Sequence, residues 1–85
     1  MKTLSINLDF GVLGGTKAIQ TKLESVPAGT WIEMNSLLSY KKTYKGNWAR
    51  VNTQTGASMG TAKRSSYNLA KDIYNMKMGY KKSGF

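Results

Sequence analysis

Hydrophobic and polar residues alternate along residues 3–10. The residues on one side of this segment are all apolar: Leu4, Ile6, Leu8 and Phe10. A period of two over eight residues predicts a half-buried strand. Glycines at positions 11, 14 and 15 end the pattern. Apolar residues then recur at helical spacing in Ile19, Leu23 and Val26, which predicts a short helix over about residues 17–25 with Thr16 as its N-cap.

Strand-like patterns return after Pro27-Ala28-Gly29. Residues 30–38 are apolar, with room for a break at Asn35-Ser36. Residues 40–45 and 48–53 flank the turn signal Gly46-Asn47, and together they predict a β-hairpin. Residues 55–60 have the glycine-rich composition of a loop.

A second helix is predicted over about residues 62–80, with Thr61 or Ser65 as its cap. Its apolar stripe consists of Leu69, Ile73, Met76 and Tyr80, and polar residues cluster on the opposite side. The predicted order is β-α-β-β-α. We therefore expect an α+β fold in one domain over residues 1–85, with a three-stranded, mostly antiparallel sheet and helices packed on one of its faces.

Charge divides the chain into two unequal halves. The formal net charge is +9, and residues 1–40 contribute nothing to it because their basic and acidic residues cancel. Residues 41–85 carry ten Lys and Arg residues and a single acid, Asp72. A neutral β-α-β half is thus followed by a basic hairpin-helix half. Such segregated charge influences which partners a protein binds, and here it favours a polyanion as the partner.

Several functional classes are disfavoured by composition. The chain has no Cys and no His, so it lacks thiolate metal ligands and the commonest general base, and we expect neither an enzyme nor a metal or cofactor site. The acids Asp9, Glu24, Glu33 and Asp72 are scattered over different elements. The glycine-rich turn before Lys17 does not fit the Walker A or dinucleotide-binding spacing, which favours a flexible turn over a phosphate cradle. With no long apolar run, we expect a cytoplasmic protein without membrane contact.

Basic and aromatic residues are interleaved in the hairpin and on the polar side of the second helix. Lysines neutralise phosphates, arginines read base edges, and aromatic rings stack on bases. The alternative is a solvated edge hairpin whose lysines prevent aggregation, with Trp48 in the core. The candidate binding residues are Tyr40, Lys41, Lys42, Tyr44, Lys45, Trp48, Arg50, Lys63, Arg64, Tyr67, Lys71 and Tyr74.

Parts of the basic half resemble known nucleic-acid-binding domains. The segments 46–51, 60–61 and 70–71 are similar to DNA-binding domains built from a three-stranded sheet and a C-terminal helix, such as plant ethylene-response domains and integrase arm-binding domains. The stretch 60–70 is also similar to the end of a double-stranded-RNA-binding domain, although that family's lysine pair at the helix start is missing. The two resemblances imply different ligands, so neither identifies a family.

Two functional hypotheses follow. The first is a small basic nucleic-acid-binding protein, with duplex DNA favoured over RNA because a two-stranded ribbon fits the major groove. The second is a small inhibitor or adaptor of phage or mobile-element type, which docks on an acidic or nucleic-acid-binding surface of a host protein. Its aromatic anchors would be Trp31, Trp48, Tyr67 and Tyr74. The first hypothesis needs the hairpin and the helix to present their basic sides in the same direction.

Overall fold

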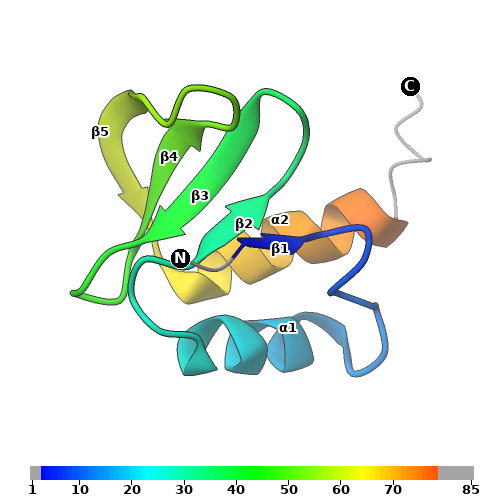
Figure 1. The fold of residues 1–85 in the computed structure, drawn as a ribbon. Coiled ribbons are helices and arrows are strands. Elements are labelled where there is room, and N and C mark those ends of the chain that lie inside the picture. The colour runs from blue at the N-terminus through cyan, green and yellow to red at the C-terminus, as the bar shows by residue number, and fades with distance from the viewer. Residues whose placement is uncertain (1–2, 79–85) are drawn as a thin grey trace.

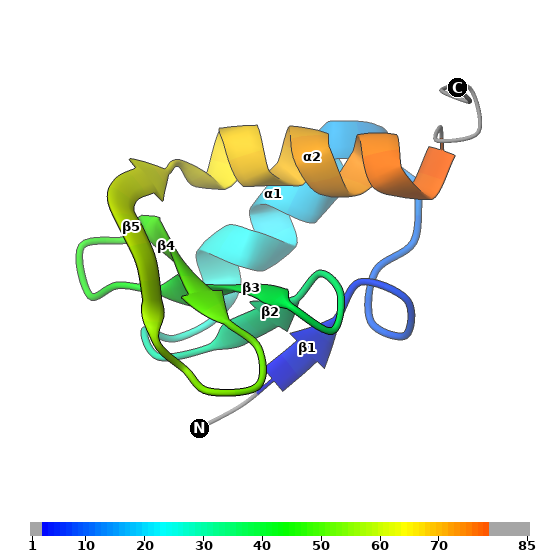
Figure 2. The same ribbon diagram turned by 90° about the horizontal axis from the view of Figure 1, so that it is seen from above.

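The computed structural model describes residues 3–78 and contains a five-stranded mixed sheet with two helices on one face (Figures 1 and 2). The elements are β1 (Thr3–Ser5), α1 (Gly15–Ser25), β2 (Trp31–Glu33), β3 (Leu38–Lys42), β4 (Trp48–Asn52), β5 (Ser58–Arg64) and α2 (Ser66–Met78). The strand order is β1-β2-β3-β4-β5, with β1 parallel to β2 and the other pairs antiparallel. The α+β class is as expected, but the prediction of three strands is wrong.

The first strand is much shorter than its alternating pattern predicted. Only Thr3–Ser5 pair with β2, and the chain then turns because the Asp9 carboxylate accepts a hydrogen bond from the Ser5 amide at 2.8 Å. Leu8, expected on the buried side, is 87% exposed. Residues 6–10 keep the alternating pattern, but the hydrogen bonds between Ser5 and Asp9 end the strand at Ser5.

The apolar segment 30–38 forms parts of two strands. Asn35 accepts hydrogen bonds from the amides of Leu37 and Leu38, both at 2.8 Å, and this side-chain turn reverses the chain. As a result β2 and β3 form one hairpin, and β3 and β4 form the next. The predicted hairpin around Gly46-Asn47 is confirmed, and it lies inside a larger sheet.

The fifth strand occupies a segment predicted as loop and helix. Residues 59–62 bulge opposite Arg50, because Lys63 pairs with Ala49 while Ser58 pairs with Val51. The strand mixes small, apolar and basic residues whose side chains are mostly exposed, so no alternation signals it. The helix consequently begins later than predicted, at Ser66. Ser65 caps it, because its hydroxyl accepts a hydrogen bond from the Asn68 amide at 3.1 Å. Tyr80, predicted on the apolar stripe, lies outside the described residues.

Helix α1 begins two residues before the predicted start. Its N-cap is Gly14, which has a left-handed backbone (φ 86°), and no side chain caps the helix, so the prediction of Thr16 as N-cap is wrong. A Cβ at position 14 would lie 2.7 Å from the Ala18 side chain. The glycine-rich turn therefore serves the entry into α1.

One core fills the space between the sheet and the two helices. Its largest fully buried hydrophobic members come from α1, β2, β4 and α2, namely Leu23, Ile32, Trp48, Leu69 and Ile73. We call the sheet side that packs on this core the covered face and the other side the open face. None of the helices within residues 3–78 has the length and apolar character needed to cross a membrane.

Candidate nucleic-acid interface

Strand register assigns the residues of the sheet to its two faces. Directly opposed residues share a face, so one row crosses all five strands of the open face: Thr3, Trp31, Lys41, Ala49 and Lys63. Lys41 and Lys63 come from β3 and β5 and flank the small residue Ala49. With strands about 4.8 Å apart, their Cα atoms lie about 10 Å apart. The fold thus brings two lysines that are distant in sequence to one side of the sheet.

The β4–β5 loop covers the other part of the open face. Ser39 and Val51 point away from the helices, yet both are buried. Thr53 lies 2.7 Å from the Ser39 hydroxyl, and a Cβ on Gly56 would lie 3.6 Å from the Trp31 ring. The free part of the open face is therefore the end near the β3–β4 turn.

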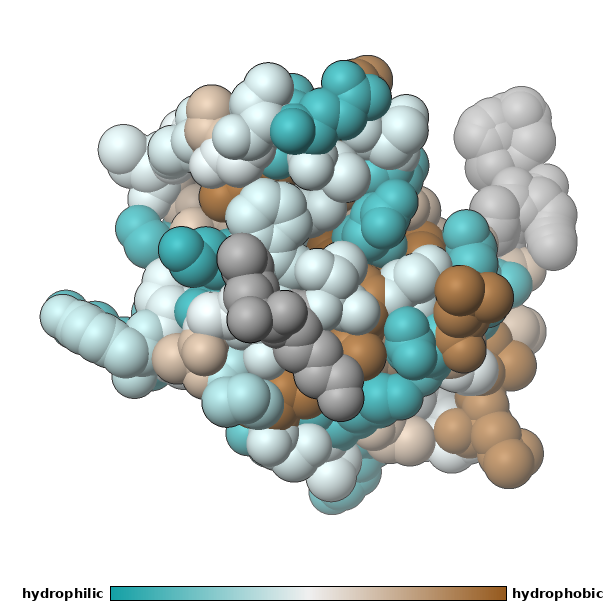
Figure 3. Space-filling model, viewed as in Figure 1, coloured by the Kyte–Doolittle hydropathy of each residue, from teal (hydrophilic) through white to brown (hydrophobic). Residues whose placement is uncertain are grey.

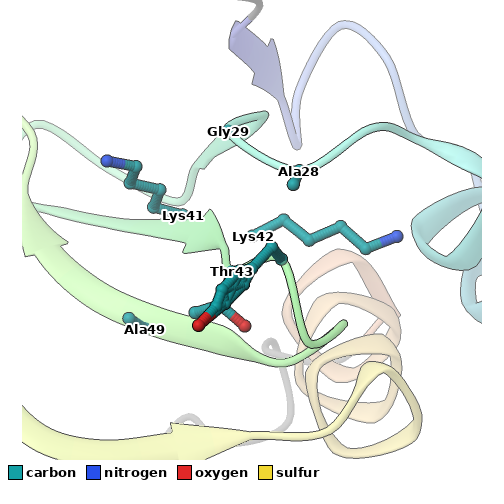
Figure 4. A pocket seen from close by; sticks show the side chains of 7 residues that line it. Ala28, Gly29, Lys41, Lys42, Thr43 and Ala49 are labelled. Carbon is teal, nitrogen blue, oxygen red and sulfur yellow. The ribbon is translucent and has the colours of Figure 1, made fainter.

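A hollow of about 550 Å³ lies at this end, between the α1–β2 loop and the β3–β4 turn (Figure 4). Its lining is mostly apolar and consists of Ala28, Gly29, Lys41, Lys42, Thr43, Tyr44 and Ala49. Figure 4 shows Lys41 and Lys42 pointing in opposite directions, the second toward α1. Tyr44 is 80% exposed, and Lys45 follows it in the turn, also exposed. We call the exposed residues Lys41, Tyr44, Lys45 and Lys63, together with this hollow, the hairpin-end surface.

Lys42, predicted to bind a partner, is instead an internal helix cap. Its ammonium donates hydrogen bonds to the carbonyls of Leu23 (2.9 Å), Glu24 (3.2 Å) and Val26 (2.8 Å) at the end of α1. A positive charge at a helix C-terminus is also favoured by the helix dipole. The side chain is 8% exposed, so it contributes only its stem to the hollow.

Trp48 and Tyr40 are also interior residues of the covered face. The Trp48 indole N–H donates to the Ser66 hydroxyl at 3.0 Å, which ties β4 to the start of α2. Burial raises the pKa of the Tyr40 phenol, Arg64 and Arg50 nearby lower that pKa, and Asp72 raises it. Neither ring is exposed enough to stack on a ligand.

Arg50 and Arg64 lie where the bulge of β5 meets α2. Arg64 forms an ion pair with Asp72 at 2.7 Å, so its charge is largely neutralised. Arg50 is exposed, and a Cβ on Gly60 would lie 3.7 Å from its guanidinium. Both residues share the covered-face rows of Tyr40 and Trp48, and so they are separated from the hairpin-end surface by the sheet.

The helix residues of the predicted site lie in the other layer of the molecule. Tyr67 and Lys71 are exposed on α2, away from its buried residues, and the Lys71 ammonium lies 5.3 Å from the Tyr67 ring centre. Tyr74 is half-buried and packs against the core. Because α2 covers one face of the sheet and Lys41 lies on the other, the basic sides of hairpin and helix point away from each other.

Acidic groups are few at the hairpin-end surface, because none of the residues that line the hollow is an acid. Glu33 is the one acid in the described strands, and it lies in the row shared with Ser39 and Ser5. Within residues 3–78 no three acidic side chains come together in a way that could hold a metal ion. The charged side chains that line the hollow are therefore Lys41 and Lys42.

Sequence reasoning missed the walls of the hollow. Ala28, Gly29 and Ala49 have no chemical signature of their own, and their juxtaposition depends on the register of β3 and β4. The neighbouring Trp31 was predicted as an aromatic anchor, but its place in a row with Thr3 and Lys41 depends on the strand register and was not predicted. No family model, curated protein or solved structure matches this chain.

Proposed function

We propose that this protein binds nucleic acid through the hairpin-end surface alone, without catalysis, in the cytoplasm. The proposal is narrower than the first hypothesis, because the basic residues of α2 lie on the other side of the sheet and do not extend this surface. The observation that carries the proposal is the row in which Lys41 and Lys63 lie on one side of the sheet, beside an exposed aromatic residue and an acid-free hollow. Phosphate neutralisation by lysine is the main source of nucleic-acid affinity, and aromatic rings supply stacking.

The embedded hairpin weakens the argument for duplex DNA. The major groove admits a two-stranded ribbon, whereas β3 and β4 are flanked by β2 and β5 in a five-stranded sheet. The surface that remains is one end of an open sheet face. Such a surface suits a single strand, whose backbone follows basic residues and whose bases stack on aromatic rings.

Salt dependence tests the proposal. Three phosphate contacts, from Lys41, Lys45 and Lys63, should give a log–log slope of affinity against salt of about −2 on single-stranded DNA. The measurement is fluorescence anisotropy of a labelled 12-nucleotide strand, and of the matching duplex, between 20 and 200 mM salt. A slope near zero, or no binding at 20 mM, would overturn the proposal.

A charge-matched pair of variants locates the surface. The double variant Lys41→Gln/Lys63→Gln should reduce the magnitude of the slope by about 1.4. The control Lys17→Gln/Lys71→Gln removes the same charge from exposed positions on α1 and α2 and should leave the slope unchanged. Equal effects of the two variants would mean that net charge, and not this surface, governs binding.

A protein-binding adaptor remains the second candidate, and one observation favours it. Leu8, Val12 and Leu13 are exposed in the β1–α1 loop, and Leu13 is 93% exposed. Apolar colours gather on this side of the molecule, at the opposite end from the β3–β4 turn (Figures 1 and 3). Of the predicted anchors, Trp48 is fully buried and cannot contact a partner. Capture of a nuclease-resistant partner that is lost in Leu13→Ser would support this candidate.

A further inference from the structure

We infer that the hollow at the hairpin end holds one unpaired nucleobase of a single-stranded nucleic acid, stacked on Tyr44. The inference rests on the proposed function and names the part of the ligand that the site takes. Tyr44 and the three alanine and glycine residues of the lining give an apolar site, and its volume of about 550 Å³ is in the range of small-ligand sites.

Both walls of the hollow are fixed by backbone hydrogen bonds. On one side, the Gly29 amide donates to the Lys42 backbone carbonyl at 2.9 Å, and the Lys42 amide donates to the Thr30 backbone carbonyl at 2.9 Å. On the other side, the Thr43 amide donates to the Asn47 backbone carbonyl at 2.8 Å, and the Gly46 amide donates to the Thr43 backbone carbonyl at 3.0 Å. The Lys42 ammonium in addition fastens β3 to the end of α1. The site is thus formed before a ligand arrives, which reduces the entropy lost on binding.

Exposure of Tyr44 has no structural explanation within the fold. Its side chain is 80% exposed at the rim of the hollow, whereas Tyr40 four residues earlier is part of the core. Tyrosine offers a large flat surface at small entropy loss, and it stacks on any base because each base has a π-face.

Charge around the hollow selects an anionic ligand. Lys41 lines it, Lys45 follows Tyr44, and Lys63 pairs with the lining residue Ala49. Among the described residues nothing forms an ion pair with these lysines, since Arg64–Asp72 is the salt bridge found there. A nucleotide joins a flat apolar base to a phosphate on each side. This combination matches an apolar hollow with lysines around it better than an acidic peptide does.

The inference is tested with two oligonucleotides and two tyrosine variants. The probes are a labelled 12-nucleotide thymidine strand and the same strand with abasic sites throughout, which keeps the phosphates and removes the bases. The variants are Tyr44→Ala and the control Tyr67→Ala, which removes an exposed tyrosine beside a lysine on the other layer. Circular dichroism and thermal unfolding confirm that both variants fold.

Stacking of one base predicts that Tyr44→Ala binds the thymidine strand about 5- to 150-fold more weakly, with an unchanged salt slope. Tyr44→Phe should bind like the wild type, and so should Tyr67→Ala. On the abasic strand Tyr44→Ala and wild type should bind equally, because the base is already missing. Equal binding of thymidine and abasic strands by the wild type would overturn the inference while leaving the phosphate-binding function intact. Absence of salt-dependent binding to either strand would overturn both.

Discussion

Lys41 and Lys42 are neighbours in β3, and the two faces of the sheet give them opposite environments. On the covered face, the Lys42 ammonium is buried and donates to three carbonyls at the end of α1. On the open face, Lys41 is exposed in a row with Lys63. The same chemical group thus supports the fold on one face and is free for a partner on the other.

Other lysines also act as internal donors in this acid-poor chain. Lys77 donates to the Ile6 carbonyl at 2.7 Å, which ties α2 to the chain after β1. Lys22 donates to the Asp9 carbonyl and lies 4.8 Å from the Phe10 ring centre. Backbone carbonyls therefore accept the lysine hydrogen bonds that carboxylates would accept in a protein with balanced charge. A count of basic residues overestimates the charge available to a polyanion.

The largest difference between the faces should appear in the stability of lysine variants. Lys42→Met removes a buried ammonium that donates hydrogen bonds to three carbonyls, and it should lower the free energy of unfolding by about 3 kcal/mol. Lys41→Met should change it by less than about 0.5 kcal/mol, because Lys41 is exposed. Urea unfolding followed by tryptophan fluorescence measures both values. Similar losses in the two variants would contradict the assignment of Lys42 as a helix cap.

Tryptophan variants provide the next comparison between the faces. Trp48→Phe leaves a cavity in the core and removes the donor to Ser66, so we expect a loss of about 2 kcal/mol in the free energy of unfolding. Trp31 lies on the open face, and its indole N–H is buried without an acceptor within residues 3–78. Trp31→Phe removes that unsatisfied donor, so stability should stay within about 0.5 kcal/mol of the wild type. The same urea titrations measure both, and a larger loss in Trp31→Phe would reverse the comparison.

The sequence predicts which residues of the hairpin share a side, but it does not predict which side is covered. Alternation places Tyr40 and Lys42 together, and the structure adds Trp48 directly opposite Lys42. A Trp in the core then implies a covered Lys42, but only once the register across the turn is known. Register depends on the hydrogen bonds of the turn and on the core beneath it, which local patterns do not specify.

Strand β5 and the parallel pairing of β1 with β2 escaped prediction for different physical reasons. Strand β5 is an exposed edge with a bulge, so its side chains need no apolar alternation. Strand β1 gains its place by pairing in parallel with β2 across α1, and such long-range pairing leaves no local signal. The burial of Leu69 and Ile73 on α2 and the turn at Gly46 were predictable because helix packing and positive φ each demand particular residues nearby. Met76, predicted on the same apolar stripe, is 44% exposed, so that part of the prediction is wrong.

Alkaline pH should lower the stability of the fold through the buried phenol of Tyr40. Burial raises the Tyr40 pKa above its ordinary value of 10.0, so the folded state holds the proton more tightly than the unfolded state. The resulting stabilisation is fully present below pH 10 and is lost as pH rises through the folded pKa. Urea midpoints of the wild type should therefore fall more steeply above pH 10 than those of Tyr40→Phe. Parallel curves for the two proteins would contradict the raised pKa.

The Arg64–Asp72 pair joins β5 to α2 on the covered face and should show the smallest effect. Its side chains are 37% and 41% exposed, and exposed ion pairs contribute about 0.2–1 kcal/mol. Asp72→Asn should lower stability by that amount at low salt and by less at 1 M salt, because salt screens the pair. Since the pair lies on the helix side of the sheet, the affinity for single-stranded DNA at 150 mM salt should change less than about twofold. A marked gain in affinity would show that the released Arg64 contacts the ligand, and the binding surface would then extend across β5 to α2.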